Sequence, residues 1–114
     1  MSRLLCTDQV RVTEITPALA VILHELERAA REIGVPSVIY VTAVHNGTHM
    51  KGSRHYTNEA VDCFTAHGVA WPDVQSFIAQ LQMALGSKFV VLHESAGTPN
   101  SHLHIQPRRG TVYP

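Results

Sequence analysis

The chain has 114 residues, and its nine Lys and Arg balance its nine Asp and Glu, so the formal net charge is zero with neutral histidines. This length is typical of one domain, and we expect a single domain over residues 1–114 with no separate targeting or binding module. The charge balance excludes the classes of protein that bind nucleic acid or a membrane surface through an overall basic field.

The N-terminus and the cysteines indicate the compartment. Polar residues interrupt the apolar pair Leu4-Leu5 at once, which predicts neither a signal peptide nor a membrane-spanning helix. We therefore expect a protein made in the cytoplasm that acts elsewhere only if it is released. Cys6 and Cys63 are too few for a disulfide framework and lack the spacing of a zinc knuckle, so we expect two buried free thiols.

The first part of the chain predicts an extended lead-in, a helix and a strand. Residues 4–14 mix apolar and polar side chains and favour a short edge strand or an extended segment. A threonine-proline pair is typical of a helix start, and apolar residues then recur at three- and four-residue steps until a glycine and a proline end the pattern. We predict a helix over residues 17–33. Residues 37–44 are rich in β-branched side chains and predict a central strand.

The middle of the chain combines a loop with a strand that carries an acidic residue. Residues 45–53 form a glycine-punctuated loop with two histidines, and loops set on a rigid sheet are where sites tend to be built. Residues 59–64 are extended, with Asp62 between two apolar neighbours on its own face. A carboxylate in apolar surroundings is costly unless it is paired or bound to a cation, which favours a metal ligand over a surface acid.

The second half predicts a helix and two further strands. Pro72-Asp73 opens the helix and Gly86 closes it, while Trp71 is expected to pack on its first turn. Residues 88–93 and 101–106 predict strands. The order of elements predicts an α+β domain, with two main helices packed on one face of a small, mostly antiparallel sheet.

Four residues of metal-binding types fall in two compact clusters. His55 and Asp62 lie in the first cluster, and His102 and His104 lie in the second. Alternate residues of a strand share a face, so His102 and His104 point the same way. Catalytic zinc takes three protein ligands and keeps a fourth position for water, and these residues supply three with one histidine to spare. The pattern predicts a zinc hydrolase, with surface histidines as the alternative for each residue taken singly.

Residues 53–62 carry a more specific pattern. They read S-R-H-Y-T-N-E-A-V-D, which resembles the S-x-H-x-x-G-x-A-x-D signature of the zinc peptidases that include D-Ala-D-Ala carboxypeptidases and phage L-alanyl-D-glutamate endopeptidases. The wider group includes murein endopeptidases and the hedgehog signalling domain. H-M-K-G at 49–52 and H-L-H at 102–104 resemble the short phage-type members. The resemblance implies a hedgehog/DD-peptidase-like fold in which His55, Asp62 and His104 bind zinc.

The catalytic residues follow less directly from this resemblance. Asn58 stands where the family has glycine, and asparagine tolerates left-handed backbone angles better than most residues. The E-x-x-W-H motif that supplies a catalytic glutamate in many carboxypeptidases is absent, so either His102, which we favour, or Glu94 serves as general base. The other candidates, each with loop ordering or a surface position as the alternative, are His49 as a donor to the oxyanion and Ser53, Arg54 and Tyr56 for substrate binding.

The resemblance implies a function and a partner. We expect a zinc-dependent peptidase that hydrolyses an amide bond in peptidoglycan stem peptides, encoded by a phage or prophage and used in lysis. The expected partner is the stem peptide, with neither nucleic acid binding nor membrane insertion. Because the usual glutamate motif is absent, the alternative is a catalytically silent zinc-binding domain that recognises cell-wall peptide or a protein.

Overall fold

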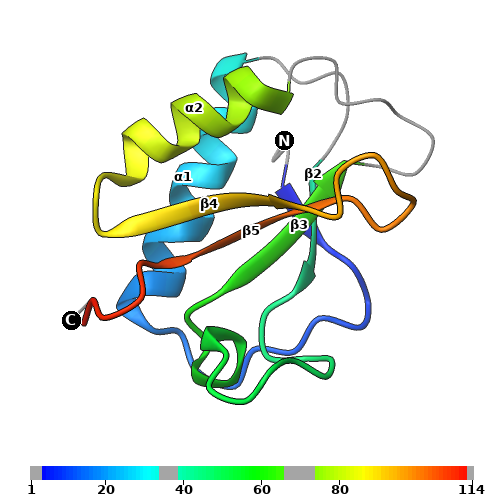
Figure 1. Ribbon diagram of the computed structural model, residues 1–114, viewed down its shortest axis with the longest axis vertical. Helices are drawn as coiled ribbons and strands as arrows, with labels where there is room; N and C mark the ends of the chain where they lie inside the picture. Colours follow the sequence, from blue (N-terminus) through cyan, green and yellow to red (C-terminus); the bar gives the residue numbers. More distant parts are fainter. Residues whose placement is uncertain (1–3, 34–38, 66–73, 113–114) are drawn as a thin grey trace.

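The computed structural model describes residues 4–33, 39–65 and 74–112 (Figure 1). These residues form two α-helices, a five-stranded sheet and one short 3-10 helix, η1. The elements follow in the order β1 (Leu4–Cys6), α1 (Pro17–Ile33), β2 (Ile39–Ala43), η1 (Arg54–Thr57), β3 (Val61–Thr65), α2 (Val74–Leu85), β4 (Phe89–Glu94) and β5 (His102–Pro107).

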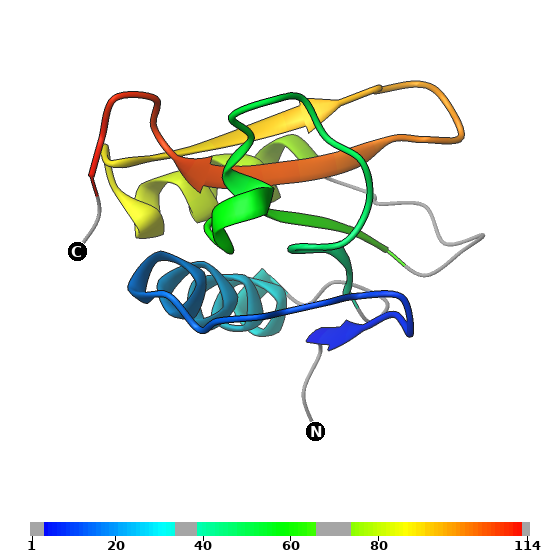
Figure 2. The same ribbon diagram turned by 90° about the horizontal axis from the view of Figure 1, so that it is seen from below.

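The strands form one mixed sheet in the order β1-β2-β3-β5-β4. β1 pairs in parallel with β2, and the other three pairs are antiparallel. The helices α1 and α2 pack against each other on one side of the sheet, and the loop of residues 45–53 rises from the other side (Figure 2). The predicted α+β class, with a mostly antiparallel sheet, is confirmed.

The first helix has the predicted bounds because its start and its buried face are both encoded locally. The hydroxyl of Thr16 accepts a hydrogen bond from the backbone N–H of Leu19 (3.1 Å) and donates to the backbone oxygen of Asn58 (2.7 Å). Thr16 therefore caps the first turn and also ties the helix to the segment after η1. The fully buried residues of α1 recur at helical spacing and comprise Ala18, Leu19, Ile22, Leu26 and Ala30.

The register of β3 against β5 positions the candidate site. Asp62 is paired with His104 across the two strands. Because side chains alternate along a strand, the flanking Cys63 and Leu103 point into the core and are fully buried. Directly paired residues of neighbouring strands have adjacent side chains. The fold thus brings together two predicted zinc ligands that are far apart in the sequence.

The second helix anchors the outer strand β4. Phe77 and Leu81 are fully buried, and Gly86 follows the helix with a positive φ of 84°, as expected after a helix C-terminus. The side chain of Gln82 donates to the backbone oxygen of Phe89 and accepts from the N–H of Val91. The predicted helix start at residues 72–73 and the packing of Trp71 lie outside the described residues. No helix in the described ranges is long and apolar enough to cross a membrane.

The two cysteines differ in exposure, so the expectation that both are buried is wrong for Cys6. Cys6 ends the short edge strand β1 and is exposed, whereas Cys63 is buried in β3. Burial and, secondarily, the charge of Asp62 raise the pKa of the Cys63 thiol well above its usual range.

We expect one thiol to react with a maleimide in the native protein and two after unfolding, because Cys6 is exposed and Cys63 is buried. Mass spectrometry of the labelled protein, with and without guanidinium, counts the modified cysteines. Rapid labelling of Cys63 in the folded protein would contradict this arrangement of the core.

Candidate metal centre

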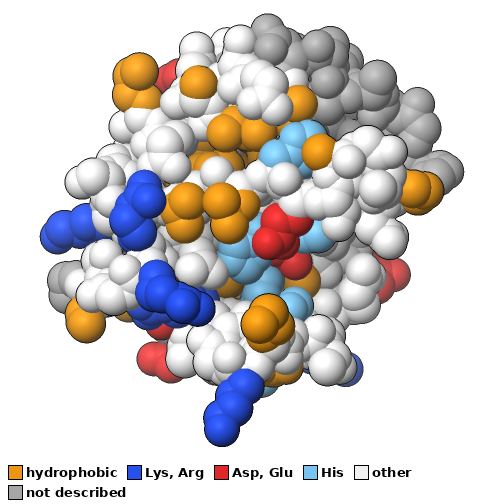
Figure 3. All heavy atoms as spheres, in the orientation of Figure 1, with side chains coloured by type: hydrophobic (Ala, Val, Ile, Leu, Met, Phe, Trp, Pro, Cys, Tyr) orange, Lys and Arg blue, Asp and Glu red, His pale blue; other side chains and the backbone are white. Residues whose placement is uncertain are grey.

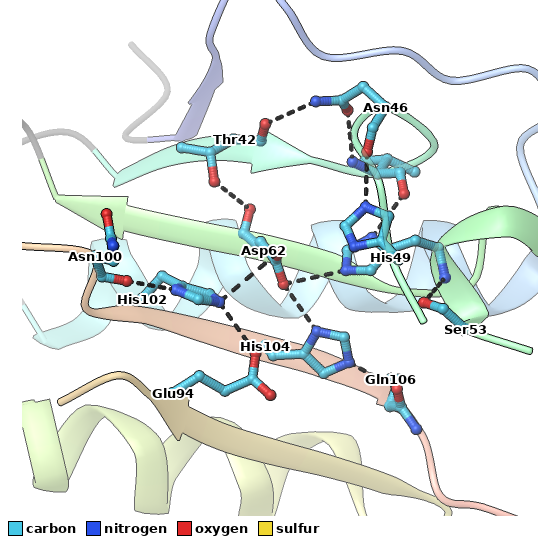
Figure 4. A network of polar contacts seen from close by, with 12 residues as sticks. Thr42, Asn46, His49, Ser53, Asp62, Glu94, Asn100, His102, His104 and Gln106 are labelled. Atoms are coloured by element: carbon cyan, nitrogen blue, oxygen red, sulfur yellow. Dashed lines mark hydrogen bonds and ion pairs between the residues drawn. The ribbon is translucent and has the colours of Figure 1, made fainter. Parts of the chain in front are cut away.

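Three side chains from three separate elements meet on the face of the sheet away from the helices. His55 comes from η1, Asp62 from β3 and His104 from β5. The Oδ1 atom of Asp62 lies 3.2 Å from Nε2 of His55 and 2.8 Å from Nδ1 of His104. The three ligand atoms all lie within 4.8 Å of one another. Figure 4 shows Asp62 and His104 pointing toward each other from their strands.

The other nitrogen of each imidazole is held by an oxygen acceptor. Nδ1 of His55 lies 2.7 Å from the backbone oxygen of Val44, and Nε2 of His104 lies 2.6 Å from Oε1 of Gln106. These acceptors require a proton on the nitrogen that faces them, so each neutral ring directs the lone pair of its other nitrogen at Asp62. A carboxylate can only accept hydrogen bonds. The centre therefore needs a cation or an extra proton, and outer carbonyl partners of this kind typically orient metal-binding histidines.

Burial and pairing set the charges of these groups. Burial opposes ionisation of Asp62, but its polar contacts with His104 and His55 outweigh this effect and hold the pKa of the carboxyl well below its usual range. Burial lowers the pKa of His104, but the hydrogen bond to Asp62 and further favourable contacts outweigh it, so the pKa is raised. Without a metal, the raised pKa of His104 favours a proton there that would balance the carboxylate. A bound cation would take the place of this proton.

We expect the zinc affinity to fall as the pH falls. The pKa of His104 is raised, so a proton competes with zinc below that pKa, whereas Asp62 stays ionised and adds no dependence. Displacement of the proton of His104 lowers the apparent affinity by at least about tenfold for each pH unit below its pKa. Zinc titrations of the metal-free protein at several pH values measure this slope. An affinity that does not change with pH would contradict the assignment of His104 as a ligand.

The short helix η1 holds His55 in place. Ser53 is its N-cap residue, and the Oγ of Ser53 accepts a hydrogen bond from the N–H of His55 (3.2 Å). Asn58 ends the helix with left-handed backbone angles, φ 57° and ψ 36°. The expectation that asparagine would accept this conformation is confirmed, and its side chain also bonds the N–H and hydroxyl of Thr13. Glycine could make the turn but not these two bonds.

The loop before η1 brings His49 against the centre. The ring of His49 stacks on that of His55 with centroids 3.9 Å apart, and its Nε2 lies 2.7 Å from the backbone oxygen of Asn46. The hydroxyl of Tyr56 accepts from the N–H of His49 (2.7 Å) and donates to its backbone oxygen (2.9 Å). Tyr56, a candidate for substrate binding, thus also fixes the loop.

Sequence reasoning missed Asn46, which organises the start of this loop. Its Oδ1 accepts from the N–H groups of Val44 and Arg11, and its Nδ2 donates to the backbone oxygen of Thr42. The only signal in the sequence is the pair Asn46-Gly47, which is typical of a tight turn. By holding Val44, Asn46 also positions the carbonyl that orients His55.

Arg54 lines the cleft, but its guanidinium is bound within the chain. Its Nη1 forms an ion pair with Glu59 (3.0 Å), and its Nη2 donates to the backbone oxygen of Thr111 (2.7 Å). These contacts tie η1 to the segment after β5. A substrate would have to contact Arg54 through guanidinium N–H groups that these two bonds do not use.

The candidate bases His102 and Glu94 lie side by side next to the candidate metal ligands. They are paired in register between β5 and β4, with Nε2 of His102 3.1 Å from Oε1 of Glu94. Nδ1 of His102 lies 2.7 Å from the backbone oxygen of Asn100, and Nε2 lies 3.9 Å from Oδ2 of Asp62. The structure thus brings both catalytic candidates to the same place (Figure 4).

These groups line one open cleft of about 690 Å³. Figure 3 shows histidine and acidic side chains together near the middle of this face, with Lys and Arg gathered beside them. Met50, Lys51, Leu92 and Arg109 also line the cleft. Of the remaining histidines, His93 bonds Ser101 instead, and His67 lies outside the described residues.

Comparison of the chain with protein-family models, with curated proteins and with solved structures finds no match. Any assignment of function therefore depends on the residues of the site and their geometry. Two imidazole nitrogens and one carboxylate oxygen suit a borderline divalent metal, and zinc is the common choice for such a set.

Proposed function

We propose that this protein is a zinc-dependent peptidase that hydrolyses an amide bond in bacterial peptidoglycan stem peptides. The observation that carries the proposal is the convergence of His55, Asp62 and His104, with both imidazoles fixed from behind by oxygen acceptors. These are the residues that the S-x-H-x-x-G-x-A-x-D resemblance assigns to zinc. The open cleft leaves room for a substrate beside them.

The chain supplies the groups that an amide hydrolysis needs. Zinc, when bound, would polarise the carbonyl and make water a stronger acid. His102 would take the proton of the attacking water on Nε2 and pass it to the leaving amine, while the adjacent carboxylate of Glu94 stabilises the imidazolium. His49 stacks on His55 and has its Nε2–H held by the backbone oxygen of Asn46, so it would donate a hydrogen bond to the developing oxyanion through Nδ1 as an imidazolium.

The cleft carries polar and cationic groups that suit a short anionic peptide. Lys51 and Arg109 line it and offer charge-assisted hydrogen bonds to the carboxylates of a stem peptide. Ser53 and Arg54 also line the cleft, whereas Tyr56 follows them in η1 and contacts the loop at His49. The resemblance to short phage-type members supports a role in phage lysis.

The second candidate function is a zinc-binding domain that recognises cell-wall peptide or a protein without turnover. One observation favours it: the residues before His104 read N-S-H-L, without the glutamate of the carboxypeptidase motif. In this alternative the three ligands hold a structural metal, and His102 and Glu94 contribute only polar contacts to the bound partner.

Metal analysis combined with a digestion assay tests the proposal. We expect purified protein to carry about one tightly bound zinc, and chelation to abolish release of peptide fragments from peptidoglycan. Mass spectrometry of the digested muropeptides identifies the bond that is cut. Full activity of a metal-free preparation would disprove the mechanism, and zinc binding without activity under any metal would favour the silent domain.

A further inference from the structure

Only one of the two carboxylate oxygens of Asp62 faces the proposed zinc ligands closely. Its Oδ1 contacts both His55 and His104, at 3.2 and 2.8 Å. Its Oδ2 lies on the side of His102, 3.9 Å from Nε2. The carboxylate therefore has one oxygen for each of two neighbouring groups of side chains.

The second group consists of Asp62, Glu94 and His102. As in the first group, one nitrogen of the histidine faces an oxygen acceptor and the other faces carboxylate oxygens. Nδ1 of His102 lies 2.7 Å from the backbone oxygen of Asn100, so the neutral ring carries its proton there. Its Nε2 lone pair then faces two carboxylates, at 3.1 Å from Glu94 and 3.9 Å from Asp62. One ligand atom from each of the three residues lies within 4.8 Å of the other two. Three acceptors converge, and a divalent cation would satisfy them all.

We infer that Asp62, Glu94 and His102 form a second divalent cation site, with the carboxylate of Asp62 bridging it to the first. A carboxylate shared in this way is a common feature of two-metal hydrolytic sites. The set of one imidazole nitrogen and two carboxylate oxygens suits zinc and other borderline divalent metals.

The second site binds more weakly than the first. The side chain of Glu94 is 45% exposed and that of His102 is 26% exposed, whereas those of His55 and His104 are 2% and 11% exposed. Solvent therefore competes more strongly at the second site and leaves its ligands more freedom. A cation at the first site also repels a second one and withdraws charge from Asp62. Zinc fills the two sites in sequence, the buried one first.

Occupation of the second site has a functional consequence, which rests on the proposed peptidase. A cation on Nε2 of His102 takes the lone pair that accepts the proton of the attacking water. Zinc in excess over one equivalent therefore inhibits hydrolysis. The binding of the second cation does not depend on the protein being an enzyme.

Calorimetric titration of the metal-free full chain with zinc chloride tests the inference. We expect two binding events, about one zinc each, with the second at least about tenfold weaker. Glu94→Gln and His102→Gln are expected to abolish the second event and keep the first. His24→Gln is the control, because His24 lies on α1 with its side chain 72% exposed and should leave both events unchanged.

The outcomes separate this inference from the proposed function. A single event at saturating zinc, or a second event that survives both Glu94→Gln and His102→Gln, overturns the second site. Two events in a protein without peptidase activity keep the second site and overturn the peptidase. If the protein is active, its rate is expected to fall over the zinc concentrations that fill the second site. A rate that does not change over that range removes the inhibitory consequence.

Discussion

The Asp62→Asn variant is expected to lose zinc binding while the metal-free protein stays folded. Asp62 supplies the only anionic ligand of the set that it forms with His55 and His104. Loss of an outer partner of a metal ligand already weakens binding by about 10- to 100-fold, so loss of the ligand should weaken it by more than about 100-fold. In the metal-free protein, the new amide can donate to the lone pairs of the two imidazoles, so the fold keeps its polar contacts.

Thermal and denaturant unfolding with chelator measure the stability of the metal-free fold, and the same experiments with zinc measure the stabilisation that zinc binding adds. Zinc at about a thousand times its dissociation constant stabilises the parent protein by about 4 kcal/mol, and the variant is expected to show no such gain. Asp8→Asn is the matched control, because Asp8 is an exposed carboxylate at a distance in sequence from the three ligands. Equal stabilisation of the Asp62 variant and the parent protein by zinc would place the metal elsewhere.

Replacement of His102 by Gln is expected to lower kcat by about 100- to 10,000-fold, the usual contribution of a general base. Zinc at the first site should remain bound, because His102 is not one of its three ligands. Glu94→Gln should lower kcat by about tenfold only, since the half-exposed Glu94 acts on the imidazolium through one hydrogen bond. Turnover of muropeptides, measured beside the zinc content of each variant, gives both quantities.

The relative size of these two effects decides which residue is the base. A large loss in Glu94→Gln with a small loss in His102→Gln would assign the proton transfer to Glu94. His24→Gln controls for the removal of a histidine, because its side chain is exposed on α1. An unchanged kcat in both base variants would remove the His102–Glu94 pair from the mechanism.

The features of the fold that could be predicted from the sequence are those set by residues close to one another in the chain. The bounds of α1 followed from a capping threonine, a proline and a helical apolar stripe. The left-handed turn at Asn58 followed from the tolerance of asparagine for positive φ. Because side chains alternate along β5, we predicted that His104 and the buried Leu103 lie on opposite faces of the sheet. The structure shows this arrangement.

The parts that could not be predicted depend on contacts between distant segments. Asn46 bonds Arg11, and Arg54 bonds Thr111, and neither pair leaves a pattern within its own stretch of sequence. The pairing of His102 with Glu94 depends on the register of β5 against β4, which a local pattern does not specify. The exposure of Cys6 likewise depends on its place at the sheet edge, since cysteine alone favours burial.

The most direct test of the zinc site is diffraction from crystals grown with one equivalent of zinc, measured on both sides of the zinc absorption edge. We expect one strong anomalous peak bound by His55, Asp62 and His104, at about 2.0–2.1 Å from each nitrogen and about 2.0–2.2 Å from the carboxylate oxygen. A zinc peak bound by other residues, or these three side chains in bonding contact with one another and with no zinc between them, would contradict the proposed centre.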